Sequence, residues 1–152
     1  MSIDERLSQL GITLPDAVRP LGAYVPAVRA GSLVFLSGHV STVLDPPIRG
    51  RLGGDLDIEA GRRAARGVAI ALLGTLRTAA GSLDRVQRIV RLTGMVASSP
   101  DFTDQPRVID AASELFAEVF GESGRHARAA FGVASLPAGA AVEIDLVAEL
   151  VE

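Results

Sequence analysis

The chain has 152 residues, 48% of them hydrophobic, so it is long enough to bury the core of one domain. It contains neither cysteine nor lysine, which excludes disulfides, thiol nucleophiles, lysine Schiff bases and P-loops. The net charge of -3, the 4% of aromatic residues and the two histidines do not fit the patterns of nucleic-acid binders or of histidine-rich metal sites. We therefore expect neither nucleic acid nor metal as a partner.

The start of the chain bears on its location. Residues 2–6 lack the basic start and apolar run of a signal peptide, and no apolar run reaches the roughly 18 residues of a membrane span. The expectation is a cytoplasmic protein without a membrane partner.

Residues 2–14 have the pattern of a short amphipathic helix that ends at Gly11, and we interpret them as a helical extension of a single domain over residues 1–152. Residues 24–29 predict a first strand. Because Pro26 has no N–H to give to a ladder, this strand is expected at the edge of a sheet.

Residues 33–36 form a near-continuous apolar run, which predicts a central strand buried on both faces. Proline, glycine and aspartate then mark a long exposed loop over residues 41–55. Asp57 is suited to cap a long amphipathic helix over residues 58–80, which Gly81 would end.

The second half of the chain predicts a strand over residues 86–96, a helix over residues 105–120, and a final pair of strands joined by a tight turn. The order β-β-α-β-α-β-β indicates an α+β fold, with two helices on one face of a mixed sheet. Such a sheet leaves its other face without a cover. Because its strands are apolar on both sides, a second subunit is the natural cover, and we expect a homo-oligomer.

Two charges interrupt the final strands, Arg128 in the first and Glu143 in the second. An arginine on a strand can present a rigid fork of donors to a small carboxylate, and a glutamate beside it can hold a water or move a proton. The spacing suits adjacent antiparallel strands with both charges facing one cavity. A surface or ion-paired arginine and a half-exposed strand glutamate are the structural alternatives.

Other polar residues are weaker candidates. Tyr24 is the only tyrosine and can cap a pocket or pack in the core, whereas Ser37-Gly38 at a strand end allows close backbone approach to a ligand. His39 and His126 could form a pair, but no Gly-x-Ser-x-Gly elbow supports a serine triad.

Several blocks of the sequence resemble the YjgF/RidA family, also called reactive-intermediate deaminases or endoribonuclease L-PSP proteins. The resemblance runs from Tyr24 to Glu149. It rests on Tyr24-Val25, Ser37-Gly38, Ala127-Arg128 with Val133 and Leu136-Pro137, and Val142-Glu143-Ile144. Residues 120–128, with 92–94 and 96–98, are similar to a less-studied branch of that family.

The resemblance implies a chorismate-mutase-like fold assembled as a homotrimer, with a cleft at each subunit interface. It implies that Arg128 grips a substrate carboxylate and that Glu143 positions the hydrolytic water, assisted by the backbone carbonyl of Ala130. The residues implied to line the cleft are Tyr24, Ser37 and Gly38.

Two positions depart from the best-known members. Ala130 stands where cysteine is usual, which a main-chain role tolerates, and Asp110 stands where asparagine is common, which adds a negative charge near the ligand. The expected reaction is hydrolysis of small enamines or imines of the 2-aminoacrylate type to 2-keto acids and ammonia, without a cofactor. The alternatives are a non-catalytic trimer that binds small carboxylates or acts like a chaperone, and a ribonuclease, against which the acidic balance argues.

Overall fold

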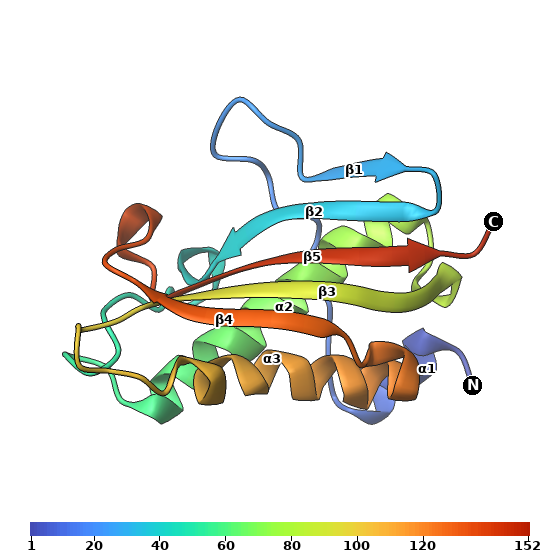
Figure 1. The fold of residues 1–152 in the computed structure, drawn as a ribbon. Coiled ribbons are helices and arrows are strands. Elements are labelled where there is room, and N and C mark those ends of the chain that lie inside the picture. Colours follow the sequence, from blue (N-terminus) through green and yellow to red (C-terminus); the bar gives the residue numbers. More distant parts are fainter.

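The computed structural model describes residues 1–152 and contains one five-stranded sheet (Figure 1). Its strands lie in the order β1-β2-β5-β3-β4, and only the β3–β4 pair is parallel. Their bounds are β1 (Ala27–Ala30), β2 (Leu33–Val40), β3 (Val86–Ala97), β4 (Ala127–Val133) and β5 (Val142–Leu150). The predicted mixed sheet and α+β class are confirmed.

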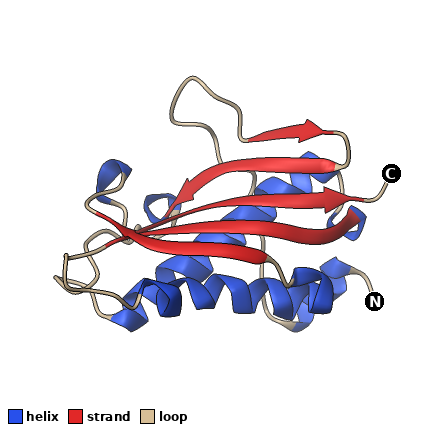
Figure 2. Ribbon diagram, viewed as in Figure 1, coloured by secondary structure: helices blue, strands red, loops and turns tan.

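Helices cover one face of this sheet (Figures 1 and 2). The two long ones are α2 (Ile58–Ala80) and α3 (Gln105–Phe120), which coincide with the predicted ranges 58–80 and 105–120. A third helix, α1 (Ile3–Gln9), is the predicted N-terminal extension and packs beside α3.

The helix ends follow from local chemistry. Asp57 accepts a hydrogen bond from the Ala60 N–H at 2.8 Å and so caps α2, which ends at Gly81 with a φ of 82°. The helix predicted over residues 2–14 is shorter, because α1 begins in a capping box at Ser2 and is already over before Gly11, where φ is 69°.

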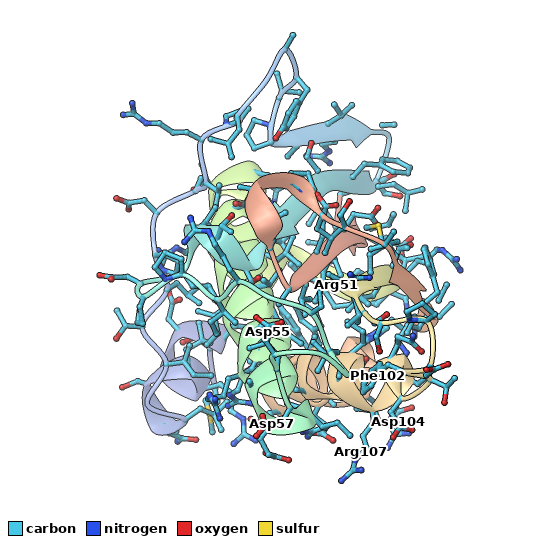
Figure 3. All side chains as sticks on the ribbon, turned by 90° about the vertical axis from the view of Figure 1, so that its left-hand side faces the viewer. Arg51, Asp55, Asp57, Phe102, Asp104 and Arg107 are labelled. Carbon is cyan, nitrogen blue, oxygen red and sulfur yellow. The ribbon has the colours of Figure 1, made fainter.

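Figure 3 views the end of the molecule at which α2 and α3 begin. Asp57 and Asp104 lie at these two helix starts, and Arg51 and Asp55 lie in the loop before α2. The Arg51 N–H donates to Asp55 Oδ1 at 2.8 Å, and Arg51 Nη2 donates to the Ser98 carbonyl at 3.2 Å. The loop is largely exposed, as predicted, and these hydrogen bonds tie it to the end of β3.

The predicted pairing of the last two strands is wrong. β4 pairs only with β3, in parallel, and β5 lies between β2 and β3. The physical reason lies in burial: every second residue of β5 is buried in a strand with neighbours on both sides, whereas β4 is more exposed and forms an edge.

The first strand is also displaced from its prediction over residues 24–29. β1 starts at Ala27, so Tyr24 and Val25 lie before it, although Ser37 of β2 still holds this segment. The Ser37 N–H donates to the Pro26 carbonyl at 2.9 Å, and Ser37 Oγ donates to the Val25 carbonyl at 2.6 Å.

The face of the sheet opposite the helices has no cover within the chain (Figure 2). Phe35 and Phe131 are both 44% exposed, and Val28 is 54% exposed. The main core, by contrast, lies between sheet and helices and includes the fully buried Leu92 and Phe116. An exposed apolar sheet face of this kind marks an interaction surface.

Candidate functional site

Glu143 lies on the open face of the sheet. Its neighbours Val142 and Ile144 are buried in the core under the helices, so alternation along β5 turns Glu143 to the other side, opposite Met95 of β3. Burial raises the pKa of the Glu143 carboxyl above its usual value, and the charge of Asp145 raises it further. A carboxyl with a raised pKa holds a proton more readily than an ordinary glutamate, which suits it to proton transfer.

Gly38 makes room for this carboxylate. A Cβ atom at position 38 would lie 2.8 Å from Glu143 Oε1 and 3.1 Å from its Cδ, closer than real Cβ contacts. The register of the β2–β5 pair shifts between Leu36 and His39, which places the Gly38 backbone beside the carboxyl. The structure thus brings two predicted site residues, Gly38 and Glu143, into contact.

Ser37 and Tyr24 form no hydrogen bond with the Glu143 carboxyl. The Ser37 hydroxyl is used to anchor Val25, and Tyr24 is 50% exposed, with its hydroxyl accepting only a local hydrogen bond from the Leu21 N–H at 3.4 Å. The Tyr24 side chain therefore has no hydrogen bond to a distant part of the chain.

Arg128 lies on the helix side of the edge strand β4. It is paired in register with the buried Leu92, and its Nη1 donates to Asp110 Oδ1 of α3 at 2.7 Å. The same nitrogen donates to Ser113 Oγ at 3.2 Å, and Nη2 donates to the Pro106 carbonyl at 3.4 Å. The Arg128 side chain is 23% exposed and that of Asp110 is 46% exposed, so this ion pair is open to an incoming ligand.

Arg128 and Glu143 consequently point to opposite faces of the sheet in one chain. Their strands are separated by β3, so the expectation that they face one cavity on adjacent strands is wrong for a single chain. Ala130 shares the side of Arg128, by alternation along β4, and packs against the helix-side core. A site that contains both charges requires a second chain.

The model of the family described as "YjgF/chorismate_mutase-like, putative endoribonuclease" matches residues 4–150. The chain belongs to the YjgF/RidA family. It is 45% identical to protein TCP17 of Trypanosoma cruzi over 146 residues, which is 95% of this chain and 91% of that protein.

Two solved structures are similar to this YjgF/RidA protein over most of its length. A crystal structure described as that of a "putative endoribonuclease" from Shewanella oneidensis is 31% identical, with a TM-score of 0.94 over 99% of this chain and 100% of that one. RidA from Psychrobacter sp. is 26% identical, with a TM-score of 0.61 over 89% of this chain and 94% of that one.

Sequence reasoning missed one polar cluster of this YjgF/RidA protein. His126, two residues before Arg128, accepts or donates a 3.0 Å hydrogen bond at Nε2 with Ser113 Oγ. The signal was present in the sequence, because Ser113 follows Asp110 by three residues and so lies on the same face of α3. His39 does not belong to this cluster, because its Nε2 contacts Thr75 Oγ1 at 2.7 Å. The suggested pairing of the two histidines is therefore wrong.

The largest hollow of this family member lies elsewhere. It measures about 1030 Å³ and is lined by residues between 13 and 18, residues 43–49 and the outer side of α2. None of the predicted site residues lines it. No group of three metal-ligating side chains occurs, and no helix is long and apolar enough to cross a membrane.

Proposed function

We propose that the protein deaminates small reactive enamines and imines of the 2-aminoacrylate type, at clefts between the chains of a homotrimer. The observation that carries this proposal is the Glu143 carboxyl, which has a raised pKa and sits against Gly38 on an apolar face that needs a partner. Membership of the YjgF/RidA family supports the reaction class.

In the proposed reaction, the enamine first tautomerises to the imine by protonation at carbon. Water then adds to the imine carbon, and the resulting carbinolamine loses ammonia to leave a 2-keto acid. Glu143 takes a proton from the attacking water and returns it to the departing nitrogen, and the Ala130 carbonyl helps to hold that water. No cofactor takes part.

Arg128 binds the substrate carboxylate in this proposal. A guanidinium has five N–H donors, and Arg128 uses three of them, two toward Asp110 and Ser113 and one toward Pro106. Two donors therefore remain, enough for one carboxylate in a bidentate arrangement. Asp110 holds the guanidinium in place and lowers its net charge, which favours a singly charged ligand over a more highly charged one.

The trimer brings the two charges together. Arg128 lies at the β4 edge of one chain, and Glu143, Gly38, Ser37 and Tyr24 lie on the open face or its border in the next. The exposed Phe35, Phe131 and Val28 supply the apolar surface that such an assembly buries. We expect a trimeric mass in sedimentation or light scattering; a monomer would remove the shared site.

The deciding assay generates 2-aminoacrylate from serine with a dehydratase and follows the excess rate of pyruvate and ammonia release. Arg128→Ala removes a contact worth about 2–5 kcal/mol in a desolvated site, so activity should fall by a factor of about 30 or more. The activity of Glu143→Gln, which keeps the shape of the side chain but removes the base, should fall by a similar factor. Wild-type rates in both variants would refute the assignment.

A binding module without catalysis is the main competing function. It predicts that small carboxylates raise the melting temperature, through Arg128, while no ammonia is released. Ribonuclease activity is disfavoured by the net charge of -3. RNA cleavage by pure protein that disappears in Glu143→Ala would establish it instead.

A further inference from the structure

Ser113 and His126 form a hydrogen-bonded pair whose proton positions follow from its partners. His126 Nδ1 lies 2.7 Å from the Gly124 carbonyl oxygen, which can only accept, so Nδ1 carries a hydrogen. In the neutral ring Nε2 is therefore a free base, and the Ser113 hydroxyl donates to it at 3.0 Å. This is the arrangement of an activated nucleophile: hydroxyl, base, and a third group that fixes the base.

The surroundings hold the His126 ring in this orientation. Its edge packs on the Phe116 ring, with 5.9 Å between centroids and an interplanar angle of 88°. Gly124, which supplies the orienting carbonyl, is buried so tightly that a Cβ atom there would overlap the Phe116 backbone oxygen. Burial, with the nearby positive charge of Arg128, lowers the pKa of His126 and keeps the ring neutral at physiological pH.

Arg128 completes the group from the other side of the hydroxyl. Its Nη1 donates to Ser113 Oγ at 3.2 Å, so negative charge that develops on or beside this oxygen meets a guanidinium. The group opens on a hollow of about 370 Å³ along α3, which runs beside the β4 edge (Figure 1). Its lining residues are Ser113, Glu114, Ala117, Arg125, His126 and Arg128.

The hollow favours a small anion. Arg125 is paired only with Glu122, at 3.2 Å, and both side chains are largely exposed, so this ion pair exchanges easily with a ligand. Arg125 and Arg128 line the hollow with one carboxylate, Glu114, which is already paired with Arg62 at 2.9 Å, whereas Asp110, the partner of Arg128, lies outside the lining. A ligand with one carboxylate beside its reacting group matches this balance.

A second pair in the same molecule shows why access matters. His39 Nδ1 lies 2.8 Å from the Ser37 carbonyl and its Nε2 contacts Thr75 Oγ1 at 2.7 Å, which repeats the pattern of His126 and Ser113. His39 is only 3% exposed and Thr75 only 1% exposed, so that pair links α2 to β2 and reaches no ligand. The Ser113–His126 pair differs because it lines a hollow and because Arg128 donates to its hydroxyl.

We propose that Ser113 is a nucleophile, activated by His126, that accepts the acyl group of small anionic esters. Ser113 Oγ attacks the ester carbonyl carbon while its proton passes to His126 Nε2, and that proton leaves with the alcohol. Water then attacks the acyl-serine, gives its proton to Nε2, and releases the carboxylic acid as Ser113 regains its hydrogen. The sum is ester plus water to acid plus alcohol, with no other reactant, and this activity goes beyond the proposed deamination because it uses residues of one chain and does not involve Glu143.

The absence of native cysteine allows a sharp test, because Ser113→Cys introduces a single thiol. If His126 acts as its base, the pKa of the introduced thiol falls below the ordinary value of about 8.5. The pH at which iodoacetamide alkylates this thiol at half its maximal rate should then be at least one unit lower than for an ordinary cysteine. Ser123→Cys is the matched control, since the Ser123 side chain lies in the neighbouring turn Gly121–Gly124 and outside the hollow. Adding His126→Gln to Ser113→Cys should restore the ordinary pH dependence.

Two further readouts test the ligand class and the turnover. For each cysteine variant, the alkylation rate with anionic iodoacetate is divided by the rate with neutral iodoacetamide. This ratio should be about tenfold higher at position 113 than at position 123, because two arginines line the hollow. Wild-type protein should hydrolyse 4-nitrophenyl hemisuccinate at least about tenfold faster than Ser113→Ala, with Ser123→Ala as the control. An ordinary thiol pKa in folded Ser113→Cys, or equal hydrolysis by wild type and Ser113→Ala, would overturn the proposal; neither result depends on whether the protein deaminates enamines.

Discussion

Gly38→Ala tests the contact between the Gly38 backbone and the Glu143 carboxyl. The added Cβ would lie 2.8 Å from Oε1, 3.1 Å from Cδ and 3.3 Å from Cγ of Glu143. An ordinary contact needs at least about 3.4 Å, so the carboxyl has to move by roughly 0.6 Å or more. The obstacle is the end of a flexible side chain, so the carboxyl yields at little cost to the fold.

Function should respond far more than stability. A displacement approaching 1 Å of a catalytic group costs up to about 10²-fold in rate, so kcat in the 2-aminoacrylate assay should fall ten- to a hundredfold. The free energy of unfolding should change by less than about 1 kcal/mol, because Gly38 does not have a left-handed φ and alanine fits its backbone. Gly54→Ala is the control, since its Cβ would meet nothing closer than 3.4 Å and has no contact with Glu143.

The result that would refute this reasoning is full deaminase activity in folded Gly38→Ala. A large loss of stability without a selective loss of kcat would also contradict it, because the glycine would then serve packing and not the site. Measuring urea unfolding beside the kinetics separates the two outcomes.

Three further outcomes are expected. Gly124→Ala should lose about 2 kcal/mol or more in urea unfolding, because its Cβ overlaps the Phe116 backbone oxygen; an unchanged midpoint would contradict the packing. His39, whose pKa is lowered chiefly by burial, contributes stability that is present above its ordinary value of 6.5 and lost as the pH falls through its folded pKa, so His39→Gln should flatten the acid side of the stability profile. Asp110→Asn should strengthen carboxylate binding several-fold in a thermal-shift titration by freeing the charge of Arg128, and weaker binding would show that Asp110 is needed to position it.

Glu143 gives the opposite pH dependence. Its pKa is raised in the folded state, so its contribution to stability is fully present below its ordinary value of 4.5 and is lost as the pH rises through the folded pKa. The free energy of unfolding of Glu143→Gln, relative to that of wild type, should therefore rise as the pH is raised to neutral. Parallel profiles for the two proteins would show that the carboxyl is not desolvated.

The local signals of the sequence were sufficient for the two long helices. Asp57 and Gly81 bound α2 because a cap and a left-handed turn act within one helical turn of the residue that supplies them. Pro106 likewise lies in the first turn of α3. The apolar run over residues 33–36 became β2, but its side chains alternate between the two faces and Phe35 is 44% exposed, so the prediction of a strand buried on both faces is wrong for a single chain. The family resemblance was readable as well, because it rests on short blocks of residues.

The sequence predicted candidate site residues but not their arrangement. Glu143 and Gly38 do meet, whereas Arg128 was assigned to the wrong neighbouring strand. Alternation tells which residues of one strand share a face, but it does not say which strand lies alongside. Ser113 was not predicted, because its proposed role depends on a hydrogen bond to His126, which lies beyond the end of α3.

The sequence by itself determined the α+β class, the extents of the long helices, the family, and the side chains with which chemistry can be done, since the lack of lysine and cysteine leaves few others. The tertiary structure alone decided that β3 lies between β4 and β5. It also set the register that pairs Arg128 with Leu92 and Glu143 with Met95, and so put the two charges on opposite faces. The physical reason is that caps and periodicities act over a few residues, whereas strand order and the hydrogen bond from Ser113 to His126 arise from packing between distant segments.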